Sequence, residues 1–212
     1  EQEKRFKKYY DLLIEYNKKF NITAITEREE VIHKHFVDSV LGVDKFCGKT
    51  LLDVGSGGGF PAICIKIMKE DLSVTLLEAT GKKCDFLNTV IEKLQLKDVR
   101  VINDRAENLA KDEKYREKFS HCSARAVARL NTLCEYCLPF VKVGGTFIAY
   151  KGDADEEVKE AENAIKVLGG KLEKVEKYEL LGAKRALICI KKENSTDKKY
   201  PRGQGKERKN PL

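Results

Sequence analysis

The sequence of 212 residues lacks the features of a membrane-spanning or metal-dependent protein. No run approaches the roughly 18–20 apolar residues of a membrane span, and the N-terminus has no signal-peptide core. Histidine occurs only three times, and Cys134 and Cys137, the single Cys-x-x-Cys pair, have no second pair to complete a zinc site. The seven cysteines, an odd number, predict reduced thiols in a cytoplasmic protein without a metal, and Cys134 and Cys137 are expected to be buried.

Positive charge is concentrated at the two ends of the chain. Residues 1–20 contain six Lys/Arg against four Asp/Glu, and residues 191–212 contain eight against three. The formal net charge is +7, so the residues between the two ends are neutral overall. Basic ends on a neutral body favour contact with a polyanion, and a solvated, partly disordered tail is the alternative interpretation.

Short apolar runs alternate with helical segments from residue 50 onward. This alternation predicts an α/β fold, in which a mostly parallel, Rossmann-like sheet is covered by helices on both faces. The last two strands have no helix between them, so an antiparallel strand is expected to close the sheet. The seven predicted strands are residues 50–54, 73–78, 99–102, 119–124, 146–150, 171–179 and 185–191. The predicted helices are residues 60–69, 82–95, 130–138 and 156–168.

The residues before the first strand are expected to form two helices. Apolar side chains recur at helical spacing from Phe6 to Phe20, and Thr26-Glu27-Arg28-Glu29 has the form of a capping box that opens a second helix. We therefore expect one compact domain with three parts: a helical extension over 1–45, a ligand-binding domain over 46–192 and a basic tail over 193–212.

The strongest chemical signal is a glycine-rich loop after the first predicted strand. Asp53 and Val54 are followed by Gly55-Ser56-Gly57-Gly58-Gly59, and then by Phe60-Pro61 at the start of a helix. Glycine allows positive φ and lets a ligand approach the backbone closely. Because ligands of open α/β sheets bind at the carboxyl ends of strands, this loop predicts a ligand site.

Three kinds of ligand can be distinguished by the glycine spacing. A dinucleotide fingerprint would need glycine where Phe60 stands, and the only Gly-Lys-Thr, at residues 48–50, precedes the strand instead of following it. The glycines at 55, 57 and 59 behind Asp53 resemble motif I of Rossmann-like S-adenosylmethionine methyltransferases. Glu78 ends the next strand, where a carboxylate can accept both ribose hydroxyls of a nucleoside. The candidate cofactor residues are therefore Asp53, Gly55, Gly57, Gly59 and Glu78.

The sequence has none of the motifs that serve two common methyl acceptors. It contains no Asn-Pro-Pro-Tyr or Asp-Pro-Pro-Tyr for adenine amino groups and no Pro-Cys for pyrimidine C5. Guanine N7 needs neither device, because it carries a lone pair and no proton, so alignment and desolvation can supply the catalysis. We therefore assign no catalytic acid or base. Another RNA, a small molecule, and a catalytically silent role in ribosome assembly remain alternatives at this point.

Segments along nearly the whole chain resemble the bacterial 16S rRNA guanine-N7 methyltransferase family RsmG, also called GidB. The resemblance implies methylation of a guanosine in the 530 loop of 16S rRNA, free or in the small ribosomal subunit. We also expect a cytoplasmic monomer with no membrane partner. The matching segments are Asn21–Ile25, His35, Asp38-Ser39, Asp53–Pro61, Lys82-Lys83, Phe86-Leu87, Arg105–Glu107, Arg125–Ala128, Tyr150–Gly152, Tyr200–Arg202 and Asn210–Leu212.

The resemblance also assigns residues to the cofactor pocket. Gly55 and Phe60 line it, Ala106 and Glu107 lie by the adenine, and Arg125 takes the remaining cofactor position. Arg125 ends the fourth predicted strand, where it can pair with the methionine carboxylate or with an RNA phosphate. A structural ion pair is the alternative for Arg125.

N7 lies in the deep major groove of A-form RNA, so the target must be splayed out of a loop. The candidate phosphate-binding residues beside Arg125 are Lys151, Arg185, Arg202 and Lys209. Because the tail ends in segments that match the family, we expect it to contact RNA. Removing the residues after Glu193 should then weaken rRNA binding and spare cofactor affinity.

Overall fold

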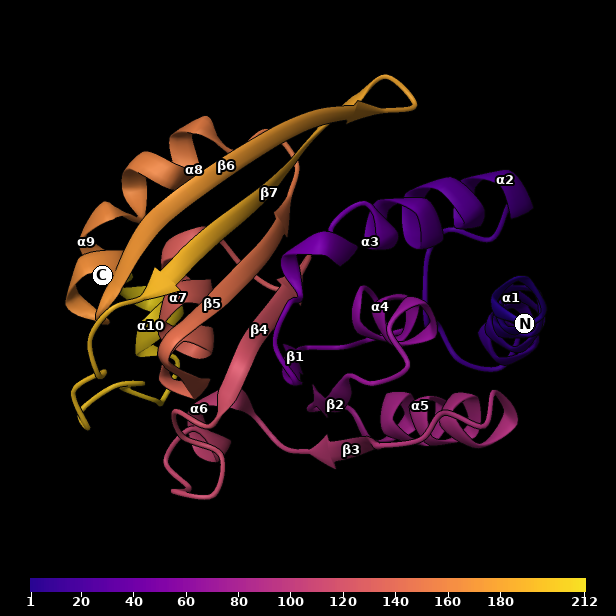
Figure 1. Ribbon diagram of the computed structural model, residues 1–212, viewed down its shortest axis with the longest axis horizontal. Helices are drawn as coiled ribbons and strands as arrows, with labels where there is room; N and C mark the ends of the chain where they lie inside the picture. The colour runs from indigo at the N-terminus through magenta and orange to yellow at the C-terminus, as the bar shows by residue number, and fades with distance from the viewer.

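The computed structural model covers residues 1–212 and contains one sheet of seven strands in the order β3-β2-β1-β4-β5-β7-β6 (Figure 1). Strands β1 to β5 pair in parallel, whereas β7 runs antiparallel to both β5 and β6. This arrangement confirms the predicted fold class. The strands are β1 (Thr50–Val54), β2 (Ser73–Glu78), β3 (Val99–Asn103), β4 (Phe119–Arg125), β5 (Val141–Lys151), β6 (Gly170–Leu180) and β7 (Ala183–Lys192).

Helices cover both faces of the sheet, as the alternation of patterns predicts (Figure 1). Helices α1, α4 and α5 contribute to the apolar cluster on one face, and α6, α7 and α9 to the cluster on the other. The helix predicted over 156–168 is two short helices that meet at Ala161. No helix combines the length and the apolarity that crossing a membrane requires. These helices are α4 (Ala62–Met68), α5 (Gly81–Lys93), α6 (Ala106–Leu109), α7 (Leu130–Cys137), α8 (Asp155–Glu160) and α9 (Glu162–Val167).

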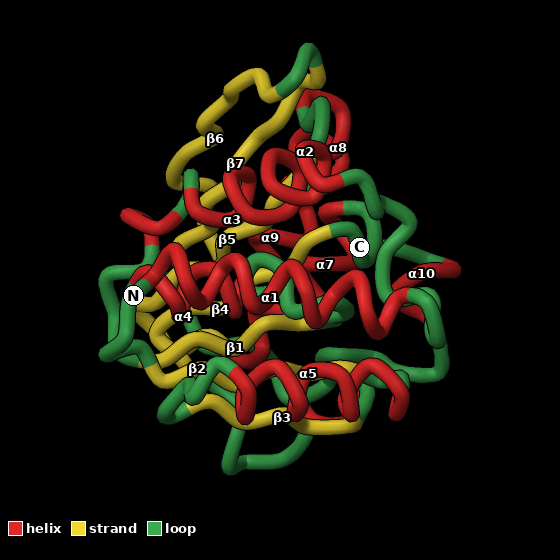
Figure 2. The backbone as a smooth tube through the Cα atoms, turned by 90° about the vertical axis from the view of Figure 1, so that its right-hand side faces the viewer, coloured by secondary structure: helices red, strands yellow, loops and turns green.

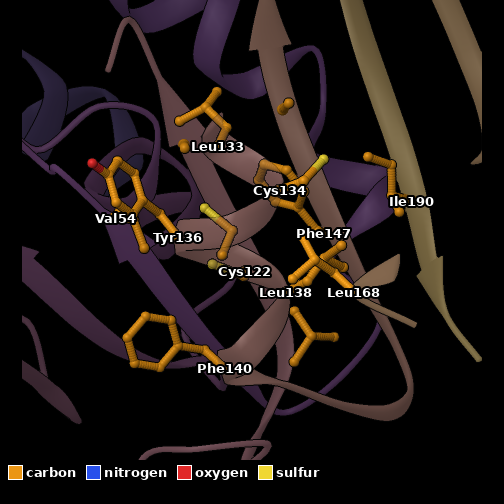
Figure 3. Packing of buried hydrophobic residues seen from close by; sticks show 14 of the residues in the cluster. Val54, Cys122, Leu133, Cys134, Tyr136, Leu138, Phe140, Phe147, Leu168 and Ile190 are labelled. Carbon is orange, nitrogen blue, oxygen red and sulfur yellow. The ribbon is translucent and has the colours of Figure 1, made fainter. Parts of the chain in front are cut away.

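Strands β1 and β2 are nearly continuous apolar runs because both faces of the sheet are buried there, whereas the edge strand β6 is largely exposed. Leu51 and Leu52 are fully buried, and they belong to the clusters on opposite faces. Figure 3 shows part of the cluster on the α7 face, which includes Cys134. Cys134 and Cys137 are both fully buried in this cluster as free thiols, which confirms the buried-thiol interpretation.

The N-terminal residues form the expected helical extension, which packs beside α4 and α5 (Figure 2). The second helix does not open with a capping box. It begins at Arg28 with Glu27 as its N-cap, which makes no side-chain capping hydrogen bond. Thr26 therefore lies one position too early for its hydroxyl to cap the helix. The segments are α1 (Gln2–Asn17), α2 (Arg28–Val31), a π-helical turn (Ile32–Val37), α3 (Asp38–Val40) and a 3₁₀ turn (Val43–Lys45).

The basic tail is folded onto the domain. Thr196, Tyr200 and Glu207 are 4%, 8% and 0% exposed, and a short helix, α10 (Lys206–Lys209), forms near its end. Arg116 holds the first part of the tail, because its guanidinium donates to the backbone oxygens of Thr196 and Tyr200 at 2.8 and 2.9 Å. The interpretation of these residues as a solvated, partly disordered tail is therefore wrong.

Candidate active site

The glycine-rich loop connects the carboxyl end of β1 to α4. Gly55, Gly57 and Gly59 have φ angles of +68°, +56° and +92°, where residues with a side chain are strained. A Cβ at Gly59 would lie 2.5 Å from both Tyr9 Oη and Ile63 Cδ1, so packing requires glycine at that position. At Gly57 the nearest atom to such a Cβ is Gly55 O at 3.8 Å. The backbone at Gly57 therefore faces open space that a ligand can enter.

Glu78 lies at the end of β2 beside this loop. Its Oε2 accepts a hydrogen bond from Gly57 N at 2.9 Å, and its Oε1 accepts one from Thr80 N at 2.8 Å. Asn103, at the end of β3, donates from Nδ2 to Glu78 O at 2.9 Å. Each carboxylate oxygen keeps acceptor capacity, so this fixed carboxylate can bind a pair of neighbouring hydroxyl groups.

Asp53 is buried beneath the loop, where one of its two carboxylate oxygens has no partner. Ser123 Oγ donates to Asp53 Oδ1 at 2.6 Å, whereas Oδ2 accepts no hydrogen bond from the chain. Burial raises the pKa of Asp53 from 3.8 to about 7, with the hydrogen bonds from Ser123 and Ser56 opposing the shift. A hydrogen-bond donor or a cation of a bound ligand would satisfy Oδ2 and favour the charged carboxylate.

Asp53→Asn is expected to stabilise the ligand-free protein at pH 8. Because the pKa is raised on folding, protonated Asp53 stabilises the fold below about pH 4, and this contribution is lost as the pH rises through 7. The neutral amide avoids this loss, which amounts to about 2–4 kcal/mol at pH 8. Urea unfolding of both proteins at pH 5 and pH 8 measures it. A stability difference that does not grow between these pH values would contradict the prediction.

Phe60, His35 and Arg125 form a stack next to the loop. The ring centroids of His35 and Phe60 are 4.5 Å apart, and the Arg125 guanidinium lies 5.2 Å from the Phe60 centroid. Burial and the Arg125 charge lower the pKa of His35 to about 4, so its ring is neutral. His35 Nδ1 is 3.3 Å from Arg125 Nη2 and Nε2 is 2.8 Å from Thr23 Oγ1. The ring therefore accepts a hydrogen bond from Arg125 and donates one to Thr23.

Asp38 binds several side chains at this corner of the site, a role that was not predicted for it. Its side chain is 6% exposed, and Oδ2 accepts a hydrogen bond from Arg125 Nη1 at 3.0 Å. Tyr178 Oη donates to Oδ1 at 2.8 Å, and Arg185 Nε lies 3.7 Å from the same oxygen. The Arg125 guanidinium thus forms an ion pair with the helical extension. The partners are about 90 and 140 residues apart in the chain, so no local pattern could reveal them.

Ala106 and Glu107 lie at the start of α6, directly after β3. Ala106 is 8% exposed and packs in the α7-side cluster, and the Glu107 side chain is 16% exposed. Since β3 is paired in parallel with β2, both residues lie on the same edge of the sheet as Glu78. The structure thus brings the predicted cofactor residues from three neighbouring strand ends to one edge.

The predicted phosphate-binding residues separate into two groups. Arg125, Lys151 and Arg185 line one cavity of about 370 Å³ at the carboxyl ends of β4 and β5. Within this cavity Lys151 Nζ pairs with Glu157 at 2.7 Å. These three cations are therefore brought together at the mouth of the site.

Arg202 and Lys209 lie apart from this cavity. Arg202 is bound through its Nε and Nη2 to Glu135, whose side chain is 1% exposed, with the closest contact at 2.7 Å. This pair ties the tail to α7. Lys209, at the end of α10, is exposed and makes no ion pair.

The strand order, the glycine loop after β1 and the carboxylate at the end of β2 define a Rossmann-like, S-adenosylmethionine-dependent methyltransferase. A SAM-dependent methyltransferase from Aquifex aeolicus has a TM-score of 0.60 at 17% identity, covering 80% of this chain and 96% of that one. Geranyl diphosphate C-methyltransferase from Streptomyces coelicolor, solved with S-adenosyl-L-homocysteine, has a TM-score of 0.58 at 14% identity, covering 74% and 78%. At these identities the likeness concerns the fold.

The sequence comparisons show the family. The family model described as rRNA small subunit methyltransferase G (GidB) matches residues 2–188. The chain is 49% identical over 216 residues to ribosomal RNA small subunit methyltransferase G from Acetivibrio thermocellus, covering all of this chain and 89% of the relative. It is 48% identical over 219 residues to the one from Lactobacillus acidophilus, covering all of this chain and 91% of the relative. The chain therefore belongs to this family, and S-adenosylmethionine is its cofactor.

Proposed function

We propose that this protein methylates N7 of a guanosine in the 530 loop of 16S rRNA, presented as free rRNA or in the small ribosomal subunit. The observation that carries the proposal is the cavity that Arg125, Lys151 and Arg185 line beside the glycine loop. Asp38 and Glu157 also line this cavity and hold the three cations in place. Cations fixed in this way at the carboxyl ends of β4 and β5 suit a nucleotide whose flanking phosphates must be held while its base enters the site.

The residues at the carboxyl ends of β1 to β3 fit the cofactor. Glu78 would accept the ribose hydroxyls, and the open backbone at Gly57 leaves room for the cofactor beside it. The unpartnered Oδ2 of Asp53 fits the cationic methionine end. Ala106 and Glu107 would border the adenine. The bound cofactor supplies an electrophilic methyl group on a sulfonium.

The chain contributes orientation and not proton transfer. The N7 lone pair forms the new bond to the methyl carbon as the carbon–sulfur bond breaks, and no proton leaves the guanine. Arg125 lines the acceptor cavity and its guanidinium rests on the Phe60 ring, so this pair would align the base and exclude water. Lys151 and Arg185 would hold the neighbouring phosphates. Exposed Lys209 would add a peripheral phosphate contact.

Arg202 would contribute to rRNA binding mainly by holding the tail in place. Its guanidinium is engaged by Glu135, and its side chain is 24% exposed. An RNA phosphate could reach only the exposed edge of the guanidinium.

We also propose that the protein acts in the cytoplasm. We propose that it acts there as a monomer, since one chain supplies every residue named for the site.

Methyl transfer to rRNA tests the proposal directly. Labelled S-adenosylmethionine is incubated with the protein and either 30S particles or naked 16S rRNA from a strain that lacks the homologous enzyme. The label is expected on guanine N7 in the 530 loop, where it is mapped by cleavage at 7-methylguanosine. Label on another base, or none on either substrate, would reject the proposed function.

A further inference from the structure

Four lysines without acidic partners gather where α1 ends and α5 begins. Lys18 and Lys19 directly follow α1, and Lys82 and Lys83 lie in the first turn of α5. None of the four forms an ion pair, whereas many other cations of the chain do. Phe20 lies among them, half-buried, with Lys82 Nζ 5.1 Å from its ring centroid. We call these four lysines with Phe20 the lysine surface.

The two helices that carry this surface are held against each other. Figure 2 shows α1 and α5 side by side on one flank of the sheet. The Tyr16 and Phe86 rings pack with centroids 5.3 Å apart, and Tyr16 Oη is hydrogen-bonded to Thr89 Oγ1 at 3.1 Å. Because these contacts fix α1 on α5, the four charges are brought together by the fold and not by flexible segments.

The lysine surface lies next to the cofactor residues. After Phe20 the chain continues to Ile22, whose Cγ2 would be 3.2 Å from a Cβ at Gly58 in the glycine loop. On the other side, Lys82 follows Thr80, whose backbone N–H binds the Glu78 carboxylate. The surface therefore borders the cofactor site on the side of α1 and α5, whereas the cavity of Arg125 borders it at β4 and β5.

We propose that the lysine surface binds single-stranded rRNA next to the target nucleotide, with lysines on phosphates and Phe20 against a base. This inference rests on the proposed function. Unpaired cations on a surface that also presents an aromatic ring are the combination that single-stranded nucleic acids require, and here Lys82 lies directly beside Phe20. The nearest carboxylates along the two helices, Glu15 and Asp85, are exposed and form no ion pair with these lysines, so the positive charge is available to a polyanion.

Charge-removing pairs of substitutions test the proposal, with the full chain and naked 16S rRNA as the probe. The test pairs are Lys18→Gln with Lys19→Gln and Lys82→Gln with Lys83→Gln. The control pair is Lys93→Gln with Lys97→Gln, which removes the same charge at the last residue of α5 and just after it. Each test pair is expected to weaken rRNA binding about tenfold and to reduce the slope of log affinity against log salt by about 1.4–1.8. The control pair should leave both values unchanged. Lys82→Arg with Lys83→Arg should restore wild-type binding.

Phe20→Leu separates stacking from charge, because leucine keeps the packing of the side chain and removes the ring. It is expected to weaken rRNA binding severalfold with an unchanged salt slope. Unchanged rRNA binding in both lysine pairs would overturn the proposal. Loss of S-adenosylmethionine affinity alone would do so too, because the lysines would then serve the cofactor. An effect on 30S particles but not on naked rRNA would point to a ribosomal protein and overturn it as well.

The two proposals can fail separately. If wild-type protein labels a base other than guanine N7 while the lysine pairs still lose rRNA affinity, the proposed function fails and the lysine surface stands. If N7 is labelled but the lysine variants bind rRNA normally, the lysine surface fails alone.

Discussion

A chain that ends at Glu193 is expected to lose at least about 4 kcal/mol of its free energy of unfolding, a large part of the total for a domain of this size. The truncation removes Tyr200 and Thr196 from buried positions and leaves the Glu135 carboxylate, 1% exposed, without Arg202. It also removes Thr196 Oγ1 from Lys192, a fully buried ammonium group. This expectation revises the prediction from the sequence, in which removing these residues weakens rRNA binding and spares cofactor affinity.

A single substitution isolates the main contribution. Arg202→Leu is expected to cost about 3–5 kcal/mol in urea unfolding, because it leaves a buried carboxylate unpaired. Glu135→Leu combined with Arg202→Leu should recover most of this loss, since no buried charge then remains. Lys199→Gln is the control, because Lys199 is exposed and its closest carboxylate, Asp197, lies 3.6 Å away. A change of less than about 0.5 kcal/mol for Arg202→Leu, the usual size for an exposed residue, would show that the tail is not anchored this way.

Glu78→Gln is expected to raise the dissociation constant for S-adenosylmethionine about 100-fold. The carboxylate accepts Gly57 N and Thr80 N on separate oxygens, and an amide offers only one acceptor oxygen for these donors and for the ribose. Losing two hydrogen bonds to a charged group costs about 3 kcal/mol, which corresponds to that factor. Isothermal titration calorimetry measures the change.

The matched control for this prediction is Glu92→Gln, at the exposed end of α5. It removes the same charge away from the site and should bind the cofactor as the wild type does. Unfolding curves of both variants separate loss of binding from loss of structure. Cofactor affinity within a factor of three of wild type in a folded Glu78→Gln protein would remove Glu78 from the proposed ribose contact.

Local sequence was enough to predict the strands and the cofactor loop. The central strands β1 and β2 are short apolar runs with turn residues at their ends, and their predicted bounds match the structure. The glycine loop and Glu78 were predictable because both follow strands, and the ends of parallel strands meet at one edge. The prediction of a capping box was wrong, because the helix begins at Arg28, one residue too late for Thr26 to be its N-cap.

Pairs between residues far apart in the chain could not be predicted from the sequence. From the sequence, Arg125 could bind a ligand or form a structural ion pair. The fold brings Asp38 within 3.0 Å of its guanidinium. The free oxygen of Asp53 likewise depends on Ser123, a residue of the neighbouring strand β4. A charged side chain can pair within the protein or stay free for a ligand. The outcome depends on distances between segments, and local sequence spacing does not determine these distances.

The basic ends of the chain show the same division. The sequence by itself determined that the termini are positive, that an α/β sheet lies between them and that a glycine loop follows the first strand, because composition and periodicity are local properties. Only the tertiary structure decided that Arg202 of the tail is bound to Glu135 of α7, while Lys82 has no ion pair and lies beside Phe20, a residue far from it in the sequence. The physical reason is that burial and pairing decide what a charge does, and both arise only when the chain is packed.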